Sequence, residues 1–339
     1  MKQRIDYIDL AKGFCILLVI LNHTFGPLSF GEPNRIFSCF RMPLYFFLSG
    51  LFFKKYAGLV NFTLRKTNKL LVPFVFFLVI TYLFYCVKWL IEGQSGLILQ
   101  LPLNIEKGFK LEEIYINGPL WFLVCLFETS AIFYLLTAFC NRLKINEESR
   151  KVIMAVICFL VGLIGFELGI HKIDLPLWID TSLTAVPFYY TGSFLREKTN
   201  ILLPNKLDKF IPVFLLIFGT IVYFMAKRVT MVLNEYQGSY ISFYVVAISG
   251  TLFVLLLSKL LLKVPVVSFL GRYSVIVLCT HMIAISILNR FFSSFIISNG
   301  WVSSLLILFF VALISIPVAK FFLRFFPKFV CQKDLIKVD

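Results

Sequence analysis

The stretch DYIDLAKGFCILLVILNHT, residues 6–24, decides the fold, because it is a long apolar run with ionisable side chains at both ends. Asp9, Lys12 and His23 interrupt it. An α-helix turns about 100° and rises about 1.5 Å per residue, so the step from Lys12 to His23 covers nearly three whole turns, roughly 16 Å. These two side chains are therefore expected on one stripe, with Asp9 one turn before Lys12 and able to pair with it. Ionisable groups on one face of a membrane helix indicate a pathway inside the protein.

The composition excludes a water-soluble domain. The chain has 339 residues, of which 59% are hydrophobic and 15% are charged, and its mean hydropathy is +0.88. Apolar stretches of about 17 residues or more recur along the whole length, which is typical of membrane-spanning helices. The first stretch contains Lys12 and lacks a small-x-small cleavage site, so it is expected to remain as a helix. The eight cysteines show no C-x-x-C spacing and predict neither a disulfide framework nor a metal site.

The sequence therefore predicts an all-α, polytopic membrane helix bundle that forms one domain over residues 1–339. About ten spans are expected from hydropathy. Their ranges are Tyr7–Phe25, Phe37–Phe53, Leu70–Ile91, Leu120–Phe139, Val152–Ile170, Ile179–Leu195, Phe210–Ala226, Ile241–Leu262, Phe269–Phe291 and Val302–Phe322.

The net charge of +15 follows the membrane topology. Most of the 33 Lys and Arg residues fall in the segments that face the cytoplasm when the N-terminus is cytoplasmic. The positive-inside rule then places both termini in the cytoplasm, and no nucleic-acid partner is expected. The inner connection, residues 54–69, is the most basic loop, and the outer connection, residues 92–118, is long enough for a lid or a re-entrant piece.

Three further stretches combine polar residues with helix starts. In residues 40–50, Arg41 and a proline open the second helix at the outer face, and Ser49-Gly50 permits close helix packing. Gly118-Pro119-Leu120-Trp121 again places a proline at a helix start, here with an interfacial tryptophan. Residues 270–274, LGRYS, lead into a helical run that contains His281.

Taken together, these motifs resemble those of the acyltransferase-3 family of integral membrane acyltransferases. Their order and spacing cover nearly the whole chain, and its length favours the stand-alone type of the family, similar to the fucose 4-O-acetylase group, over the branch with an attached periplasmic esterase-like domain. The resemblance implies a ten-helix bundle that moves an acyl group, usually acetyl from acetyl-CoA, onto a sugar hydroxyl. The hallmark of the family is Arg or Lys, ten residues, then His, which here are Lys12 and His23. Arg is commoner at the first position. A lysine such as Lys12 fits the pattern, but it cannot bind a phosphate through two parallel hydrogen bonds as an arginine can.

The chemistry of acyl transfer assigns roles to these residues. Transfer from a thioester to an alcohol needs a base for the hydroxyl proton and donors for the developing oxyanion. His23 is the first choice as general base, or as a transient acyl-histidine carrier. Lys12 fits the phosphates of coenzyme A, with Asp9 as its partner in the catalytic stripe. No permanently bound cofactor is expected, since acetyl-CoA or another acyl-CoA is a substrate.

Each of the remaining candidate site residues has two possible roles. Arg65, Lys66 and Lys69 form a basic cluster that signals topology and could supplement the phosphate site. Arg41, Trp121 and His281 are candidates for binding the acceptor, but an interface anchor or a packing role fits each as well. Two carboxyls within apolar spans, Glu128 and Glu167, are expected to be buried and hydrogen-bonded.

The predicted partners are a glycan or lipid-linked saccharide acceptor and membrane lipids. The predicted location is the bacterial cytoplasmic (inner) membrane, as a multi-pass protein. Two other functions fit a polytopic bundle with polar interior residues. One is a transporter or flippase of a lipid-linked saccharide, although the chain shows no internal repeat. The other is a membrane subunit of a polysaccharide synthase.

Overall fold

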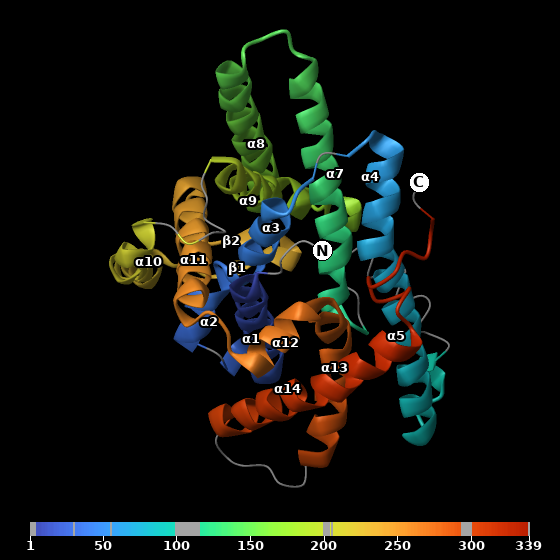
Figure 1. Cartoon of the computed structure of the whole chain (residues 1–339). Coiled ribbons are helices and arrows are strands. Elements are labelled where there is room, and N and C mark those ends of the chain that lie inside the picture. Colours follow the sequence, from blue (N-terminus) through green and yellow to red (C-terminus); the bar gives the residue numbers. More distant parts are fainter. Residues whose placement is uncertain are drawn as a thin grey trace. The chain divides into compact units, whose positions relative to one another are not determined.

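The computed structural model describes residues 5–29, 31–54, 56–98, 116–198, 204, 206–292 and 300–337. Within these ranges the protein is built almost entirely of helices, as predicted (Figure 1). The strands in the described ranges are β1 (Val229–Thr230) and β2 (Glu235–Tyr236), which pair antiparallel with Val229 opposite Tyr236.

The helices follow the apolar runs of the sequence. They are α1 (Asp6–Ser29), α2 (Gly31–Ser38), α3 (Arg41–Leu51), α4 (Leu59–Lys66), α5 (Val72–Ile91), α7 (Trp121–Arg142), α8 (Glu147–Ile170), α9 (Ile179–Lys198), α10 (Ile211–Met225), α11 (Tyr240–Leu261), α12 (Pro265–Arg272), α13 (Ser274–Phe292) and α14 (Gly300–Phe325).

Eight helices in the described ranges are long and apolar enough to cross a membrane. They cover Asp6–Thr24, Leu59–Ile91, Gly118–Arg142, Glu147–Ile170, Asp208–Met225, Tyr240–Leu261, Ser274–Phe291 and Trp301–Phe325. The chain is therefore an integral, multi-pass membrane protein. The expected count of about ten is not confirmed, and the orientation of the termini stays a prediction.

The two expected spans without a counterpart among these eight are residues 37–53 and 179–195. The first is divided between α2 and α3, and α3 has only 11 residues, whereas a spanning helix needs about 20. The second corresponds to α9, which is long enough but begins with a polar run of which Asp180, Thr181, Ser182 and Thr184 are all fully buried. Hydropathy therefore identified these two segments as apolar, but not their role as interior helices.

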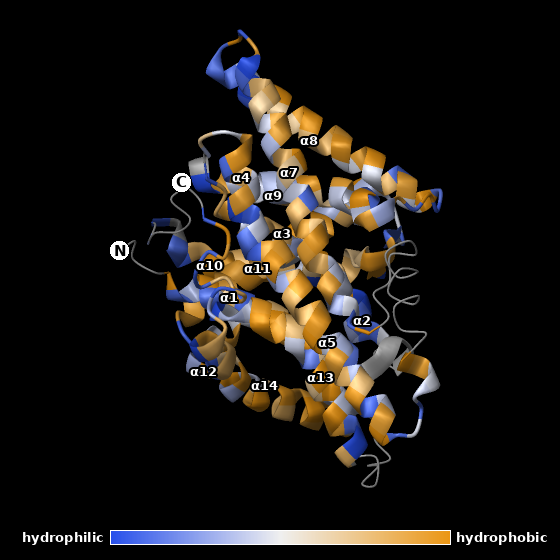
Figure 2. Ribbon diagram, turned by 90° about the vertical axis from the view of Figure 1, so that its right-hand side faces the viewer, coloured by the Kyte–Doolittle hydropathy of each residue, from blue (hydrophilic) through white to orange (hydrophobic). Residues whose placement is uncertain are grey.

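The long helices expose apolar side chains, as expected for protein surrounded by lipid. On α8 the exposed residues Val152, Val156, Leu160 and Ile164 recur every fourth position and form one stripe. Figure 2 shows such apolar, orange surfaces along α8 and α14, while hydrophilic residues gather at the turn that joins α7 to α8.

The chain divides into two compact units. The first comprises the described residues of the ranges 1–11, 32–55 and 125–264, and the second those of 12–31, 56–124 and 265–339.

In the first unit, α3 and α9 pack against each other through glycines. A Cβ atom on Gly50 would overlap the carbonyl oxygen of Tyr189, and one on Gly192 would overlap that of Phe47. The two backbones therefore approach as closely as small residues permit. This confirms the close packing that Ser49-Gly50 predicts.

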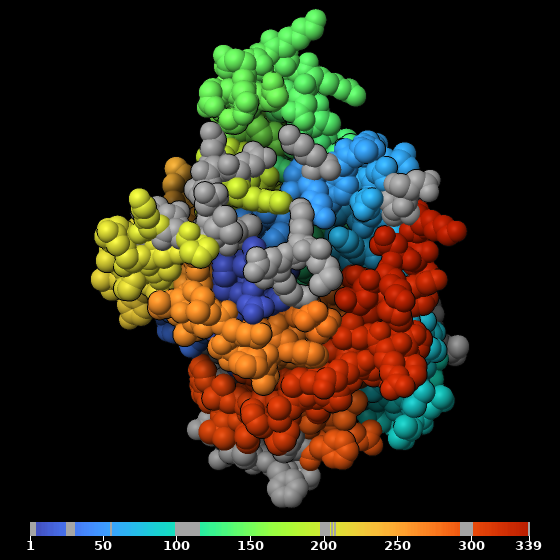
Figure 3. Space-filling model, in the orientation of Figure 1, coloured from blue at the N-terminus to red at the C-terminus, as the bar shows by residue number. Residues whose placement is uncertain are grey.

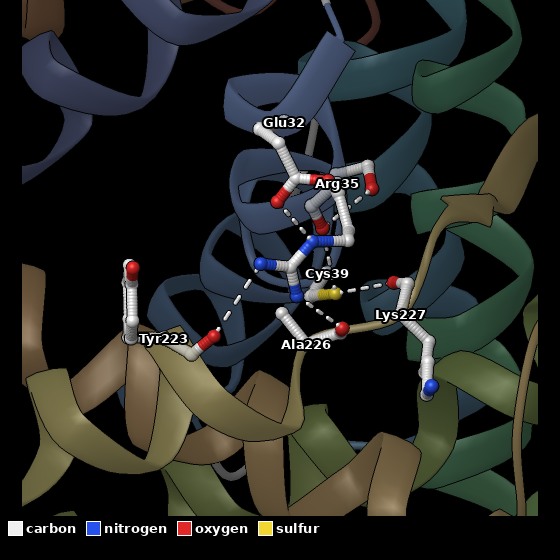
Figure 4. A network of polar contacts seen from close by, with 7 residues as sticks. Glu32, Arg35, Cys39, Tyr223, Ala226 and Lys227 are labelled. Carbon is white, nitrogen blue, oxygen red and sulfur yellow. Dashed lines mark hydrogen bonds and ion pairs between the residues drawn. The ribbon is translucent and has the colours of Figure 1, made fainter.

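A polar network in the same unit ties α2 to the segment that follows α10 (Figure 4). The Arg35 guanidinium donates to the carbonyl oxygen of Ala226 at 2.6 Å and pairs with Glu32 at 2.7 Å. The Cys39 thiol donates to the carbonyl oxygen of Lys227 at 2.7 Å. These bonds satisfy backbone carbonyls that no longer have helical partners beyond the end of α10.

In the second unit, α4 continues through a π-helical segment, Thr67–Leu71, directly into α5. The basic stretch expected as an inner loop over residues 54–69 is therefore helical from Leu59 onward, which corrects the prediction. The expected span over 269–291 is also divided, because α12 ends at Arg272 and α13 begins at Ser274. Of the long outer connection, residues 99–115 lie outside the described residues.

Candidate active site

The first helix carries Asp9, Lys12 and His23 on one uninterrupted run of α-helix, as the spacing predicts. Asp9 is buried, whereas Lys12 and His23 are partly exposed. Because the helix is continuous between them, Lys12 and His23 are separated along its axis by roughly 16 Å. The two cannot act on the same atom.

Gly13 fixes this helix against α12 in the second unit. A Cβ atom at Gly13 would overlap the backbone carbonyl of Val267. The glycine beside Lys12 is thus required by a close contact of two backbones. At the other end of the helix, the Ser304 hydroxyl of α14 donates to the carbonyl oxygen of Thr24 at 3.2 Å, next to His23.

His23 faces a second histidine. The ring centroids of His23 and His281 are 5.3 Å apart, with the rings tilted by 49°. His281 comes from the middle of α13 and is fully buried. The structure therefore joins the first and the last of the sequence motifs in one place, which the sequence alone could not show.

The hydrogen bond of His281 defines its tautomer. Its Nδ1 lies 3.0 Å from the carbonyl oxygen of Val277. Because a carbonyl oxygen only accepts, Nδ1 carries the proton, and the Nε2 of the neutral ring is a bare acceptor. This Nε2 is buried and has no hydrogen-bond partner among the described residues. An acceptor in that state is ready for a hydroxyl or N–H group.

A second unsatisfied acceptor belongs to Asn117, which the sequence reasoning missed. Its side-chain amide group donates to Thr81 Oγ1 at 3.0 Å and to the carbonyl oxygen of Cys279 at 2.9 Å. Its Oδ1 is buried without a partner in the described structure. Asn117 precedes the Gly-Pro pair at the start of a helix, the position favoured by asparagine caps, and this signal could have found it.

The basic cluster lies on helix rather than in a loop. Arg65 and Lys66 end α4, and Lys69 lies in the π-helical segment. Arg65 and Lys69 are exposed, and the Lys66 ammonium lies 6.0 Å from the centre of the Phe62 ring. Lys66 and Lys69 are close enough for their charges to repel each other. A π-bulge offsets the side chains on either side of it and is frequent at functional sites.

The other two residues predicted to bind the acceptor begin helices of different units. Arg41 begins α3 in the first unit and donates to Asn34 Oδ1 at 3.2 Å. Trp121 begins α7 in the second unit and is buried, with 7% of its surface exposed. It is therefore a packed side chain rather than an interfacial one.

Neither of the two carboxyls expected to be buried is fully buried. Glu128 is partly buried and accepts a hydrogen bond from the Ser182 hydroxyl at 2.8 Å. Glu167 is exposed and lies 3.8 Å from His171, so the prediction for Glu167 was wrong. It occupies the lipid- or solvent-facing side of α8 near the helix end. Hydropathy alone does not distinguish the two faces of a helix.

Comparison with known proteins agrees with this assembly of motifs. The model of the acyltransferase-3 family, described as an acyltransferase domain, matches residues 5–320. No curated protein and no solved structure matches the sequence.

Proposed function

The chain belongs to the acyltransferase-3 family, and we propose from this membership and its histidine pair that it is a membrane-bound O-acyltransferase. It moves acetyl, or another small acyl group, from an acyl-CoA to a sugar hydroxyl. The acceptor is a cell-surface polysaccharide or its lipid-linked precursor, and the membrane is the bacterial cytoplasmic membrane, in the manner of the fucose 4-O-acetylase group.

The single observation that carries the proposal is the contact of His23 with His281 at 5.3 Å between ring centroids. Acyl transfer to an alcohol needs a base and an acceptor that orients the hydroxyl. Two imidazoles meet that need, because an imidazole can take up a proton near neutral pH and a neutral imidazole can accept a hydrogen bond.

In the proposed reaction, His23 takes the proton of the sugar hydroxyl as the oxygen attacks the thioester carbonyl. The C–O bond forms, the C–S bond breaks, and the thiolate of coenzyme A takes up a proton. His281 accepts a hydrogen bond from a neighbouring hydroxyl of the same sugar through its bare Nε2 and so orients the acceptor. If transfer proceeds in two steps, His23 carries the acyl group and the same hydroxyl then attacks the acyl-imidazole.

The donor is threaded along α1. Lys12 binds phosphates of acyl-CoA, with Asp9 keeping its ammonium charged, while the pantetheine arm extends toward His23. The separation of roughly 16 Å along the helix requires an extended donor of this kind. Arg65, Lys66 and Lys69 supplement the phosphate site.

Radiolabelled acetyl-CoA added to sealed vesicles that contain the protein and a glycan acceptor tests the proposal. Label in the glycan supports the enzyme. Movement of glycan across the membrane without label would overturn it in favour of a transporter or flippase. Loss of polymer, rather than of its acyl groups, on removal of the protein would favour a synthase subunit.

A further inference from the structure

A strap at the C-terminal side of α14 is fastened to the basic cluster by one buried asparagine. We call residues 326–337 the C-terminal strap. Asn68, in the π-helical segment, is 1% exposed. Its Oδ1 accepts hydrogen bonds from the backbone N–H groups of Leu335, at 3.0 Å, and Ile336, at 2.9 Å. Its Nδ2 donates to the carbonyl oxygen of Ile336 at 2.8 Å. Both ends of one amide thus hold the strap.

Two further contacts keep the strap in this place. The Cys331 thiol donates to the carbonyl oxygen of Lys69 at 3.1 Å. The Phe329 ring stacks on Phe76 of α5 with 4.8 Å between centroids. Figure 1 shows the strap, in red, running beside α4 and α5, and the space-filling view shows its surface adjoining that of α4 (Figure 3).

The strap adds positive charge beside residues that are already basic. Its exposed charged residues are Lys328, Lys333, Asp334 and Lys337, so its net charge is positive. Lys333 and Lys337 lie on either side of the two residues that bond to Asn68. The backbone at Lys69 is in contact with the strap through Cys331. The lysines of the strap are thus on a segment whose backbone is bonded to the segment that carries Lys69, and a surface rich in lysines is typical of sites that bind a polyanion.

The fastening argues for a defined ligand. A polybasic segment that binds a lipid surface needs charge but no fixed backbone. Here the buried side chain of Asn68 holds the backbone of the strap at two adjacent residues. Asn68 itself lies in the π-helical segment, which changes the directions of the side chains around it, including those of Lys66 and Lys69. Binding several phosphates of one molecule rewards such preorganisation, because less freedom is lost on binding.

We propose that the C-terminal strap forms part of the donor site, with Lys333 and Lys337 joining Lys69 to bind the nucleotide phosphates of acyl-CoA. Asn68 is then a positioning residue that holds these lysines in place. The inference rests on the proposed function and assigns one end of its donor to named residues.

The first experiment removes the positive charges of Lys333 and Lys337. Lys333→Gln with Lys337→Gln is expected to raise the apparent KM for acetyl-CoA about three- to tenfold, as is typical of exposed charge contacts. Transfer from acetyl-pantetheine, which lacks the nucleotide phosphates, should not change. Lys144→Gln, an exposed lysine in the turn between α7 and α8, is the matched control. An equal effect on both donors, or no effect on either, would overturn the inference.

The second experiment releases the strap and keeps its lysines. Asn68→Ala is expected to raise the KM for acetyl-CoA as the lysine variant does, and to speed alkylation of Cys331 measured on its peptide. Lys333→Gln with Lys337→Gln should leave that alkylation unchanged, which separates release of the strap from loss of charge. If Asn68→Ala leaves both the KM and the alkylation rate unaltered, Asn68 has no positioning role.

A binding measurement tests the role of the strap in phosphate binding independently of the acyl-transfer reaction. Adenosine 3′,5′-bisphosphate carries two of the three phosphates of coenzyme A but no acyl group, and its binding to the solubilised protein should weaken in the lysine variant. If no acyl donor supports transfer but this binding still depends on the strap, only the proposed function fails. If acetyl-CoA supports transfer but the lysine variant binds adenosine 3′,5′-bisphosphate as tightly as the unaltered protein, only the inference fails.

The lipid environment provides a further control. If the lysine variant differs from the unaltered protein only in nanodiscs of anionic phosphatidylglycerol, the strap binds lipid headgroups and the inference is overturned.

Discussion

His23 and His281 lie with their ring centroids 5.3 Å apart, although one belongs to α1 and the other to α13. The ring of His281 is held by its bond to the backbone one turn earlier, so its second nitrogen points away from its own helix with a free lone pair. The two imidazoles can therefore have different roles: His23 can move a proton, and His281 can orient a hydroxyl group of the acceptor.

Replacing His23 should abolish acyl transfer without affecting expression. A general base contributes about 10²- to 10⁴-fold to the rate, and His23→Ala loses that contribution in full. The measurement is transfer of radiolabelled acetyl from acetyl-CoA to glycan in membranes with matched amounts of protein. His171→Ala is the control, because this third histidine is exposed on the surface at the end of α8. Full activity in His23→Ala would remove His23 from the reaction.

The replacement His281→Gln should weaken use of the acceptor more than use of the donor. Glutamine can donate to Val277 and still present an oxygen, but it does not reproduce the direction of Nε2. We therefore expect a loss of about 1–2 kcal/mol of transition-state stabilisation, or roughly 5- to 30-fold in kcat/KM for the glycan. Varying the glycan and the acyl-CoA separately measures this. A change confined to the acyl-CoA would place His281 on the donor side.

Asn117→Leu offers a further test of the buried acceptors. The change removes the amide that holds Thr81 and Cys279 together, and it removes the unpartnered Oδ1. We expect a loss of stability of about 1–3 kcal/mol, because the carbonyl oxygen of Cys279 and the Thr81 hydroxyl lose their shared donor. Thermal unfolding in detergent measures it. Leu120→Ala, which creates a cavity nearby in sequence without touching a hydrogen bond, shows whether the effect is specific to polar groups.

Glycine beside Lys12 is expected to tolerate no side chain. Gly13→Ala places a methyl group on the backbone carbonyl of Val267, which cannot retreat as a flexible side chain would. We expect destabilisation of about 1–3 kcal/mol. The matched control is Gly96→Ala in the same unit, because a Cβ atom there meets nothing within 4 Å. Equal thermal stability of the two variants would mean that α1 and α12 do not pack this closely.

The sequence was sufficient for the helices but not for their partners. The lipid-facing runs and the stripe of Asp9, Lys12 and His23 follow from periodicity and spacing, which are local properties of the chain. The burial of α3 and α9 did not follow, because hydropathy does not distinguish an apolar helix inside a bundle from one that faces lipid. No local pattern specifies the pairing of His23 with His281 or the hydrogen bonds of Asn68 to the C-terminal strap. Both depend on tertiary packing between segments that are distant in the sequence.

The thiol of Cys331 should be almost unreactive at pH 8 while the strap is fastened. Burial raises its pKa to about 12, and the thiol form is the one that donates to the carbonyl oxygen of Lys69. An unfolded cysteine has a pKa near 8.5, so this contact stabilises the fold fully below about pH 8.5 and less and less as the pH rises toward 12.

Since the thiolate is the nucleophile, alkylation of Cys331 by iodoacetamide at pH 8 should be about 10³-fold slower in the folded protein than in the denatured one. Peptide mass spectrometry separates Cys331 from the other seven cysteines of the chain. The folded rate should climb roughly tenfold per pH unit up to the pH at which the strap is released. A folded rate within a few-fold of the denatured rate at pH 8 would show that the thiol is not buried against Lys69 and that the strap lies free.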